Sequence, residues 1–274
     1  MENYDRLSIL VSLVLLGLVL TFIIRLPTRV VEAMVFGSPV TVTISTRVIM
    51  VLLLSALTAV GTEYIMRAHP DFDQNRVTGY SFLFWILPTF VTFVAASFTP
   101  LLVPNFFVWL GGLALTAMAL SAVIVAEYQT INDKDSSYTT ARLFLNLVTY
   151  ISGFILFTAI YGAKLRSVLS ASAILLVSTL LSLALLRAER EATALTWIYA
   201  VICGLILGEA TWALNYWAVG GLAGGGLLVL MFYFLAGITQ HHLLDRFNRF
   251  VLVEFTFVGV LGVIVLATQG TLSW

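Results

Sequence analysis

The sequence predicts an all-α polytopic membrane protein. Hydrophobic residues make up 60% of the 274 residues and charged residues only 10%, against roughly a quarter charged in soluble domains. The mean hydropathy is +1.02. Residues 77–126 contain no Lys, Arg, Asp or Glu, and at about 1.5 Å per residue this stretch is too long for one crossing of a bilayer. It therefore has to cross at least twice.

Windows of about 20 apolar residues predict nine membrane-spanning helices. They cover residues 7–24, 48–66, 80–98, 105–126, 143–163, 168–186, 193–213, 222–239 and 250–267. Pro100 and Pro104 separate the third from the fourth, because proline interrupts helical hydrogen bonding. If these two segments form a re-entrant pair, the count is eight. The first segment lacks the positive start and cleavage pattern of a secretory signal, so we expect it to be retained as a span.

A short external β-hairpin is predicted between the first two helices. Residues 40–45 alternate apolar and polar side chains after the turn signal Gly37-Ser38-Pro39, as a half-buried strand does. The hairpin is expected to cover helix ends or to present a surface to a ligand or partner. No other connection suggests a domain boundary, so residues 1–274 are predicted to form a single transmembrane domain. No internal repeat is evident, and the repeat signature of many transporters is not established.

The basic residues predict the orientation, because cytoplasmic loops carry an excess of Lys and Arg. Nine fall on one side of the predicted spans, namely Arg6, Arg67, Arg76, Lys134, Arg142, Arg187, Arg190, Arg246 and Arg249. Five fall on the other, namely Arg25, Arg29, Arg47, Lys164 and Arg166. We therefore expect an integral protein of a bacterial-type plasma membrane, with a cytoplasmic N-terminus and an external C-terminus.

Several function classes are disfavoured by composition. The 14 basic and 14 acidic residues balance, and the sequence has no basic tract that could bind along a phosphate backbone. Nucleic-acid binding is therefore not expected. Cys203 is the single cysteine, which excludes intrachain disulfides and cysteine-rich metal sites. Gln240-His241-His242 with Asp245, and His69 with Asp71 and Asp73, lack metal-site spacing and are interpreted as polar turns. Neither a metal nor a cofactor is predicted.

Glu209 is the leading candidate for function, because an ionisable group within a bilayer is costly. No Lys or Arg occurs between Arg190 and Arg246, which leaves this carboxylate without a counter-ion nearby in sequence. The candidate ligand-binding residues are Glu209, Trp212, Asn215, Tyr216 and Trp217. Helical spacing places Trp212 on one face with Glu209, and also Gly208 on one face with Thr211 and Trp212. These residues form either a pocket near the outer leaflet or an interfacial aromatic belt, with Glu209 bonded to another helix.

The other glutamates in or beside spans are interpreted as structural. Glu63 precedes Arg67 by four residues, which suits a helical ion pair. Glu127 ends a predicted helix, where it is expected to reach interfacial water. Glu254 lies near the start of the last predicted span, within reach of Arg249.

The glycines predict helix contacts. Gly204 and Gly208 form a G-x-x-x-G pattern, which favours close helix packing. Gly224, Gly225 and Gly226 begin the eighth predicted helix and indicate either close packing or local unwinding. A weak helix start beside an isolated carboxylate is also typical of a discontinuous binding helix.

Three functions are compatible with these patterns. The first is binding or transport of a small, apolar or cationic molecule in a pocket near Glu209. The second is a structural or accessory subunit held in a larger membrane complex by membrane-protein partners. The third is a membrane-embedded enzyme, with Asn146, Tyr150 and Tyr216 as helpers of Glu209. The enzyme is the least favoured of the three, because no known catalytic motif is present.

Overall fold

The computed structural model describes residues 2–24, 27–35, 38–70, 72, 81–132, 135–187, 194–217, 219–243, 256–260, 262 and 264. For residues 2, 3, 31, 33–35 and 38–43 only the backbone is described. Eight helices in this part of the chain are long and apolar enough to cross a membrane. Contacts divide the chain into two compact units, Met1–Ala141 and Arg142–Trp274. The expected single domain remains a prediction.

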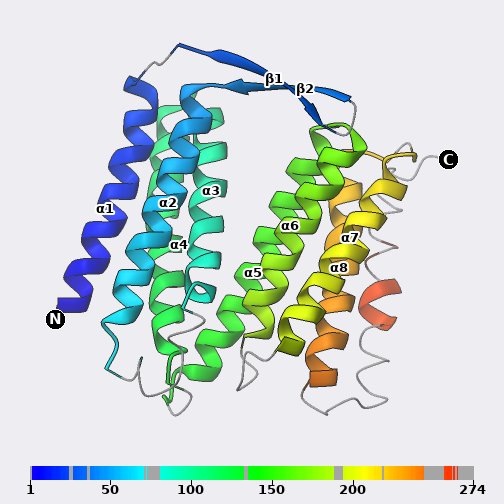
Figure 1. Cartoon of the computed structure of the whole chain (residues 1–274). Coiled ribbons are helices and arrows are strands. Elements are labelled where there is room, and N and C mark those ends of the chain that lie inside the picture. The colour runs from blue at the N-terminus through cyan, green and yellow to red at the C-terminus, as the bar shows by residue number, and fades with distance from the viewer. Residues whose placement is uncertain are drawn as a thin grey trace. The chain divides into compact units, whose positions relative to one another are not determined.

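The first unit contains four of these helices and a pair of strands (Figure 1). Its elements are α1 (Glu2–Ile23), β1 (Arg29–Val35), β2 (Ser38–Ile44), α2 (Thr46–Arg67), α3 (Leu83–Leu102) and α4 (Phe106–Gln129). Each helix packs against the next, and α4 also packs against α1. α1 also makes a smaller contact with α3, so the four helices form one bundle.

The hairpin is where the sequence predicts it. β1 and β2 pair antiparallel, and the register runs from Arg29↔Ile44 to Val35↔Ser38. Two residues connect the strands, as in a tight hairpin. Ser45 then caps α2, because its side chain accepts a hydrogen bond from the backbone N–H of Val48. The hairpin lies beyond the ends of α1 and α2 (Figure 1).

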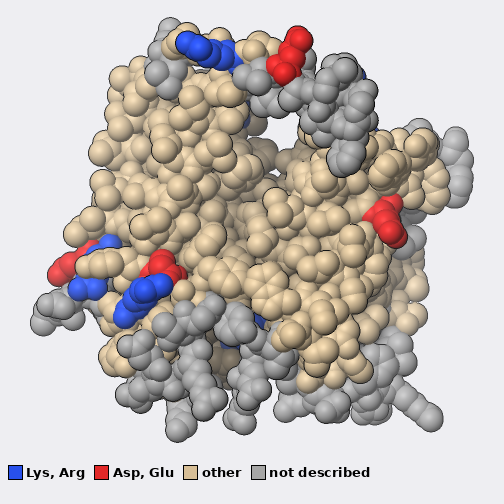
Figure 2. Space-filling view, in the orientation of Figure 1, with Lys and Arg blue, Asp and Glu red and all other residues tan. Residues whose placement is uncertain are grey.

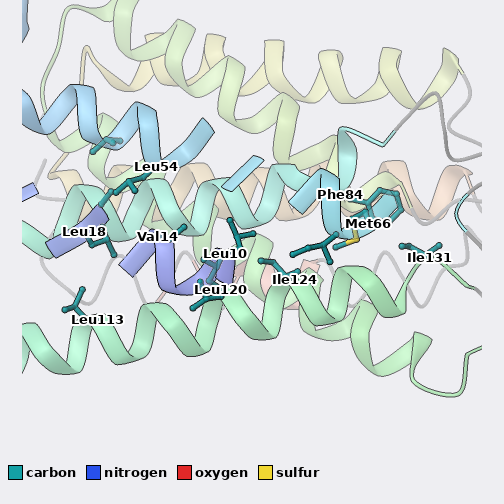
Figure 3. Close-up of a cluster of buried hydrophobic side chains, with 14 of the residues drawn as sticks. Leu10, Val14, Leu18, Leu54, Met66, Phe84, Leu113, Leu120, Ile124 and Ile131 are labelled. Atoms are coloured by element: carbon teal, nitrogen blue, oxygen red, sulfur yellow. The ribbon is translucent and has the colours of Figure 1, made fainter. Parts of the chain in front are cut away.

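The core of the first unit is a buried apolar cluster between the four helices. Leu10, Val14 and Leu18 lie one turn apart on α1 and pack in this cluster with Leu120 and Ile124 of α4 (Figure 3). Their spacing is that of one helix face. Leucine and isoleucine side chains interdigitate there at close to crystal density. Burial of this face orients the four helices of the unit.

The proline pair does not end α3 where the sequence predicts. Pro100 lies inside the last turn of α3, and the helix continues to Leu102. Because proline lacks an N–H, the carbonyl oxygen of Ala96, four residues earlier, loses its helical donor. The guanidinium of Arg47, from the start of α2, donates to the neighbouring carbonyl oxygen of Ser97. This bond joins the last turns of α3 to the start of α2.

The second unit contains the other four helices. They are α5 (Tyr138–Gly162), which starts at the boundary between the units, α6 (Ser167–Leu186), α7 (Ala194–Leu214) and α8 (Gly221–Leu243). α6 packs closely against α7, and α7 packs against α8. α6 also contacts α8, and α5 meets α8 where the ring of Phe157 lies near that of Phe232, with centroids 5.9 Å apart. Arg142 at the start of α5 donates to the carbonyl oxygen of Leu185 on α6, at 2.8 Å.

The all-α polytopic fold is confirmed. α3 and α4 have 20 and 24 residues, so each can span a membrane alone, and the re-entrant alternative for these segments is wrong. Eight of the nine predicted spans coincide with α1 to α8. The ninth, residues 250–267, falls largely outside the described residues.

The surfaces of the helices are those of a membrane protein. Leu52, Val60 and Met118 are 59%, 70% and 63% exposed, and apolar exposure on this scale marks contact with lipid or with protein. On the side of the first unit seen in Figure 2, the described charged side chains lie toward the two ends of the helices. A bilayer therefore accounts for the apolar middle of these helices.

Candidate functional site

α7 has two chemically different faces. Its buried face carries small and hydroxyl-bearing residues that pack in the second unit, namely Thr196, Ala200, Cys203, Gly204, Leu207, Gly208, Thr211 and Leu214. Its exposed face carries aliphatic side chains, among them Ile198, Ile202 and Leu205, which are 52%, 42% and 46% exposed. Glu209 lies on the exposed face, five residues before the end of the helix.

The exposed face ends in a carboxylate and aromatic side chains. Trp212 is 46% exposed and Tyr216 is 78% exposed. The indole N–H of Trp212 donates to the Tyr216 hydroxyl, with 3.4 Å between Nε1 and the oxygen. Glu209, Trp212, Ala213 and Tyr216 follow the three- and four-residue spacing of one helix face. We call these four residues the α7 face.

The remaining predicted site residues do not all join this surface. Asn215 points toward α6, where its side-chain amide donates to the Ser170 hydroxyl at 2.9 Å. Trp217 is 63% exposed and lies beyond the end of α7. Gly208 and Thr211 share a face, as predicted, but it is the buried face of α7. Trp212 lies on the exposed face with Glu209 and does not join Gly208 and Thr211, because α6 covers their side of α7, which residue spacing alone does not reveal.

Glu209 has no hydrogen-bonding or ion-pair partner among the residues that the structure describes. Over the same residues, one ion pair is present, between Arg67 Nε and Glu63 Oε1 at 2.7 Å, as predicted for this helical pair. The alternative in which Glu209 bonds to another helix is not observed among these residues. An exposed carboxylate near the carboxyl end of α7 is therefore the distinctive chemical group among the described residues of the second unit.

The glycine pattern in α7 is a packing site. A side chain at Gly204 would approach the Leu175 carbonyl oxygen to 2.8 Å and would also meet the side chain of Thr179. At Gly208 the first added carbon would come within 3.2 Å of Leu175 Cβ. The backbones of α6 and α7 are therefore very close, and the predicted close packing is confirmed.

α8 starts as a regular helix. It is continuous from Gly221 to Leu243, so local unwinding is not observed and the discontinuous-helix interpretation is wrong. Gly224 lies against the ring of Tyr161, and Gly225 lies against the side chain and backbone of Thr158. These glycines let α8 approach α5 at its first turns.

Sequence reasoning missed a set of contacts that holds the connection between α7 and α8. The hydroxyl of Tyr161, which is fully buried, donates to the carbonyl oxygen of Leu214 at 2.9 Å. Lys164 donates from Nζ to the carbonyl oxygen of Val219 at 3.0 Å, and its ammonium lies 4.1 Å from the centre of the Tyr161 ring. Tyr161 and Lys164 thereby fix both ends of the segment that carries Tyr216 and Trp217. A cation–π contact three residues apart gives little signal in a sequence.

Two further charged residues are buried. Glu127 is 1% exposed, so its predicted contact with interfacial water is wrong: the last turns of α4 remain packed within the first unit. The ring of the next residue, Tyr128, packs at a tilt against that of His69, with ring centroids 4.4 Å apart. Arg142 is 8% exposed, and its bond to Leu185 places a cation at the carboxyl end of α6, where it complements the helix dipole.

The described residues contain no group of three His, Cys, Asp or Glu that could hold a metal ion. The His242 ring packs near Tyr199, with centroids 5.9 Å apart, while Asp245 lies outside the described residues. Asp71, Asp73 and Glu254 lie outside them as well. Tyr150, named as a helper of Glu209, contacts Phe232 and Tyr233 of α8 instead.

The arrangement at the end of α7 is suited to binding rather than to reaction chemistry. A carboxylate offers an acceptor and a negative charge, and indole and phenol rings attract cations through their faces. Because the α7 face is the outer surface of a helix, whatever binds there has to approach from the membrane.

Comparison with known proteins identifies a family for this chain. No curated protein and no solved structure matches the chain. One family profile matches residues 26–269, which is nearly the whole chain. The chain belongs to the family described as "Protein of unknown function (DUF5656)".

Proposed function

We propose that this protein is an accessory subunit of a larger membrane assembly, which docks a cationic partner segment on the α7 face. The observation that carries the proposal is the exposure of Glu209 on a spanning helix, without a partner among the described residues. A carboxylate at a helix centre costs roughly 2.5–3.5 kcal/mol on insertion scales. Glu209 lies nearer the helix end, where the cost is smaller. A cation from a partner would offset the remaining cost.

The shape of the site supports a macromolecular partner. Small-molecule sites are concave and bury most of the ligand surface, whereas the α7 face is convex and half exposed. A second transmembrane segment could cover such a face along its length. Small and aromatic residues then supply packing, and Glu209 supplies specificity.

Binding or transport of a small cation is the second candidate. A carboxylate with an indole and a phenol on one surface matches the chemistry that recognises organic cations. The protein would then take its ligand from the lipid phase. An enzyme is not proposed, because no second catalytic group accompanies Glu209 among the described residues.

We further propose a bacterial-type plasma membrane, with the N-terminus in the cytoplasm and the hairpin of β1 and β2 outside. The excess of basic residues on one side of the spans supports this orientation. The α7 face would then lie near the outer leaflet, and the external hairpin would be available to the same assembly.

Co-purification from native membranes tests the proposed function. We expect a stoichiometric polypeptide to purify with the tagged wild-type chain and to be lost from Glu209→Gln, which keeps the size of the side chain and removes its charge. Glu63→Gln is the matched control, because Glu63 is already paired with Arg67. If Glu209→Gln retains the same partner, or if a defined small cation is the only species lost, the accessory-subunit proposal is contradicted.

A further inference from the structure

Hydroxyl-bearing side chains line the contact between α2 and α3. These two helices lie side by side in the first unit (Figure 1) and make its most extensive helix contact among the described residues. Ser55, Thr58 and Thr62 follow one face of α2, and they are 8%, 0% and 0% exposed. Thr89 and Thr92 are three residues apart on α3 and share a face as well. We call these five residues the α2–α3 hydroxyl cluster.

α2 and α3 run antiparallel. The hydroxyls of Thr58 and Thr92 are hydrogen-bonded at 2.9 Å near the middle of the two helices. At one end, the guanidinium of Arg47 near the start of α2 bonds to the carbonyl oxygen of Ser97 near the end of α3. A position one turn after Thr58 is therefore level with a position one turn before Thr92.

The hydroxyls on both sides of this central bond are shielded from solvent. One turn toward the end of α2, Thr62 is level with Thr89. One turn toward its start, Ser55 is level with Ala96, which has a small side chain and is 3% exposed. The hydroxyl oxygens of Ser55, Thr62 and Thr89 have no hydrogen-bonding partner among the residues that the structure describes. Buried polar groups nearly always have one.

These three hydroxyls differ from others in the same unit. A serine or threonine inside a helix can donate to the carbonyl oxygen four residues earlier, and Thr58, Thr99 and Thr116 do so. A buried polar group whose hydrogen bond is not made costs free energy. Because three such hydroxyls meet at one helix contact, a molecule bound between α2 and α3 would satisfy them together.

The cluster approaches a charged pair at the end of α2. Glu63 follows Thr62 in the chain, and its Oε1 accepts from Arg67 Nε at 2.7 Å. The other carboxylate oxygen, Oε2, is shielded and has no partner among the described residues. The side chain of Arg67 is 60% exposed, whereas that of Glu63 is 21% exposed. Polar groups therefore connect the end of the helix with the cluster.

We propose that the α2–α3 hydroxyl cluster binds water molecules within the first unit, and that water reaches it beside Glu63 and Arg67. Water fits these groups, because a hydroxyl both donates and accepts and the cluster carries no charge. A buried water makes about three hydrogen bonds, and Thr62 and Thr89 supply two at one level. This site does not depend on docking at the α7 face, which belongs to the second unit.

Bound water makes one side of α2 a polar path. From Arg67 back to Ser55 the path covers about 18 Å along the helix, which is more than half of its length. The direct bond between Thr58 and Thr92 divides the path, with bound water on either side of it. A solute as small as water can then reach the middle of the first unit from one side of the membrane.

Removal of one hydroxyl tests for bound water. Thr62→Val keeps the shape of the side chain and removes its hydroxyl, so the bonds to a bound water are lost. We expect the midpoint of thermal unfolding of the full-length protein to fall by about 2–4 °C. Thr116→Val is the matched control, because the Thr116 hydroxyl donates within its own helix, and its midpoint should stay within about 1 °C of the wild type. If the Thr62 hydroxyl has no partner, valine is neutral or stabilising, so an unchanged or raised midpoint in Thr62→Val would overturn the proposal.

Thiol chemistry tests the entry of water by a second route. In a background of Cys203→Ala, Thr62→Cys and Leu54→Cys are compared in membrane vesicles by the rate at which silver ions consume the free thiol. A thiol reacts as the thiolate, which forms only where water reaches it. Leu54 is the matched control, because it is 4% exposed and packs against Gly17 of α1. We expect Thr62→Cys to react about tenfold faster than Leu54→Cys. Equal rates would overturn the entry of water beside Glu63.

Discussion

Single side chains decide how the segment after α7 is held. Tyr161 and Lys164 bond to the backbone on either side of the connection to α8, and Asn215 bonds to Ser170. These contacts place Tyr216 and Trp217 outward. In a membrane such polar contacts contribute about 0.6 kcal/mol each on average, so several of them are needed to fix a loop.

Removing the buried hydroxyl of Tyr161 should therefore weaken the fold. We expect Tyr161→Phe to lower the free energy of unfolding by about 1 kcal/mol, because the Leu214 carbonyl loses its donor in a buried site. Unfolding by denaturant in mild detergent measures this. Tyr216→Phe is the control, since its hydroxyl is exposed, and its effect should stay within about 0.5 kcal/mol. Equal losses of unfolding free energy in the two variants would contradict a stabilising role for the buried bond from Tyr161 to Leu214.

At the same scale, the sequence predicts the candidate residue better than its surroundings. The lack of basic residues between Arg190 and Arg246 identifies Glu209, and the structure gives it no partner among the described residues. Its exposure could not be predicted, because α7 is apolar on every side and its periodicity does not show which side α6 covers. The burial of Glu127 escaped prediction for the same reason.

Small residues control the packing of whole helices. Gly204 and Gly208 bring α7 against α6, and Gly224 and Gly225 bring α8 against α5. The sequence predicts these contacts, because glycine in a membrane helix allows close approach. It also predicts α1 to α8 and the hairpin, since length and period are local properties. The end of α3 differs from the prediction: its last turns are joined to α2 by the bond from Arg47 to Ser97, 50 residues later in the chain, which no local pattern shows.

A methyl group at Gly204 should separate α6 from α7. We expect Gly204→Ala to reduce the free energy of unfolding by about 1–3 kcal/mol, because the added carbon meets the Leu175 carbonyl and Thr179. Gly111→Ala is the control: no atom lies within 4 Å of the added carbon, and alanine favours a helix by up to about 1 kcal/mol. Thermal unfolding compares the stability of the two variants with that of the wild type. A Gly204→Ala protein as stable as the wild type would contradict the close contact between α6 and α7.

At the scale of the whole molecule, the chain divides into two compact units at Ala141 and Arg142. The sequence does not predict this division, because no linker or change of composition marks it and the boundary falls in the first turn of α5.

The orientation makes a separate prediction. In a background of Cys203→Ala, a membrane-impermeant thiol reagent should label Glu32→Cys and Leu165→Cys on intact cells, since both positions are exposed in connections that we place outside. Pro70→Cys and Ser136→Cys should react only after the membrane is opened. The reverse labelling pattern would show that the proposed orientation is inverted. If the two positions of either pair were labelled differently, the predicted order of membrane crossings would be wrong.

The central claim is that the α7 face docks a partner chain. Native mass spectrometry of the wild-type protein, extracted gently from its own membranes, tests this most directly. The account predicts an intact complex whose mass exceeds the 30.1 kDa of one chain by that of a different polypeptide in fixed ratio. A chain that appears alone, or only with copies of itself and a bound small molecule, would contradict it.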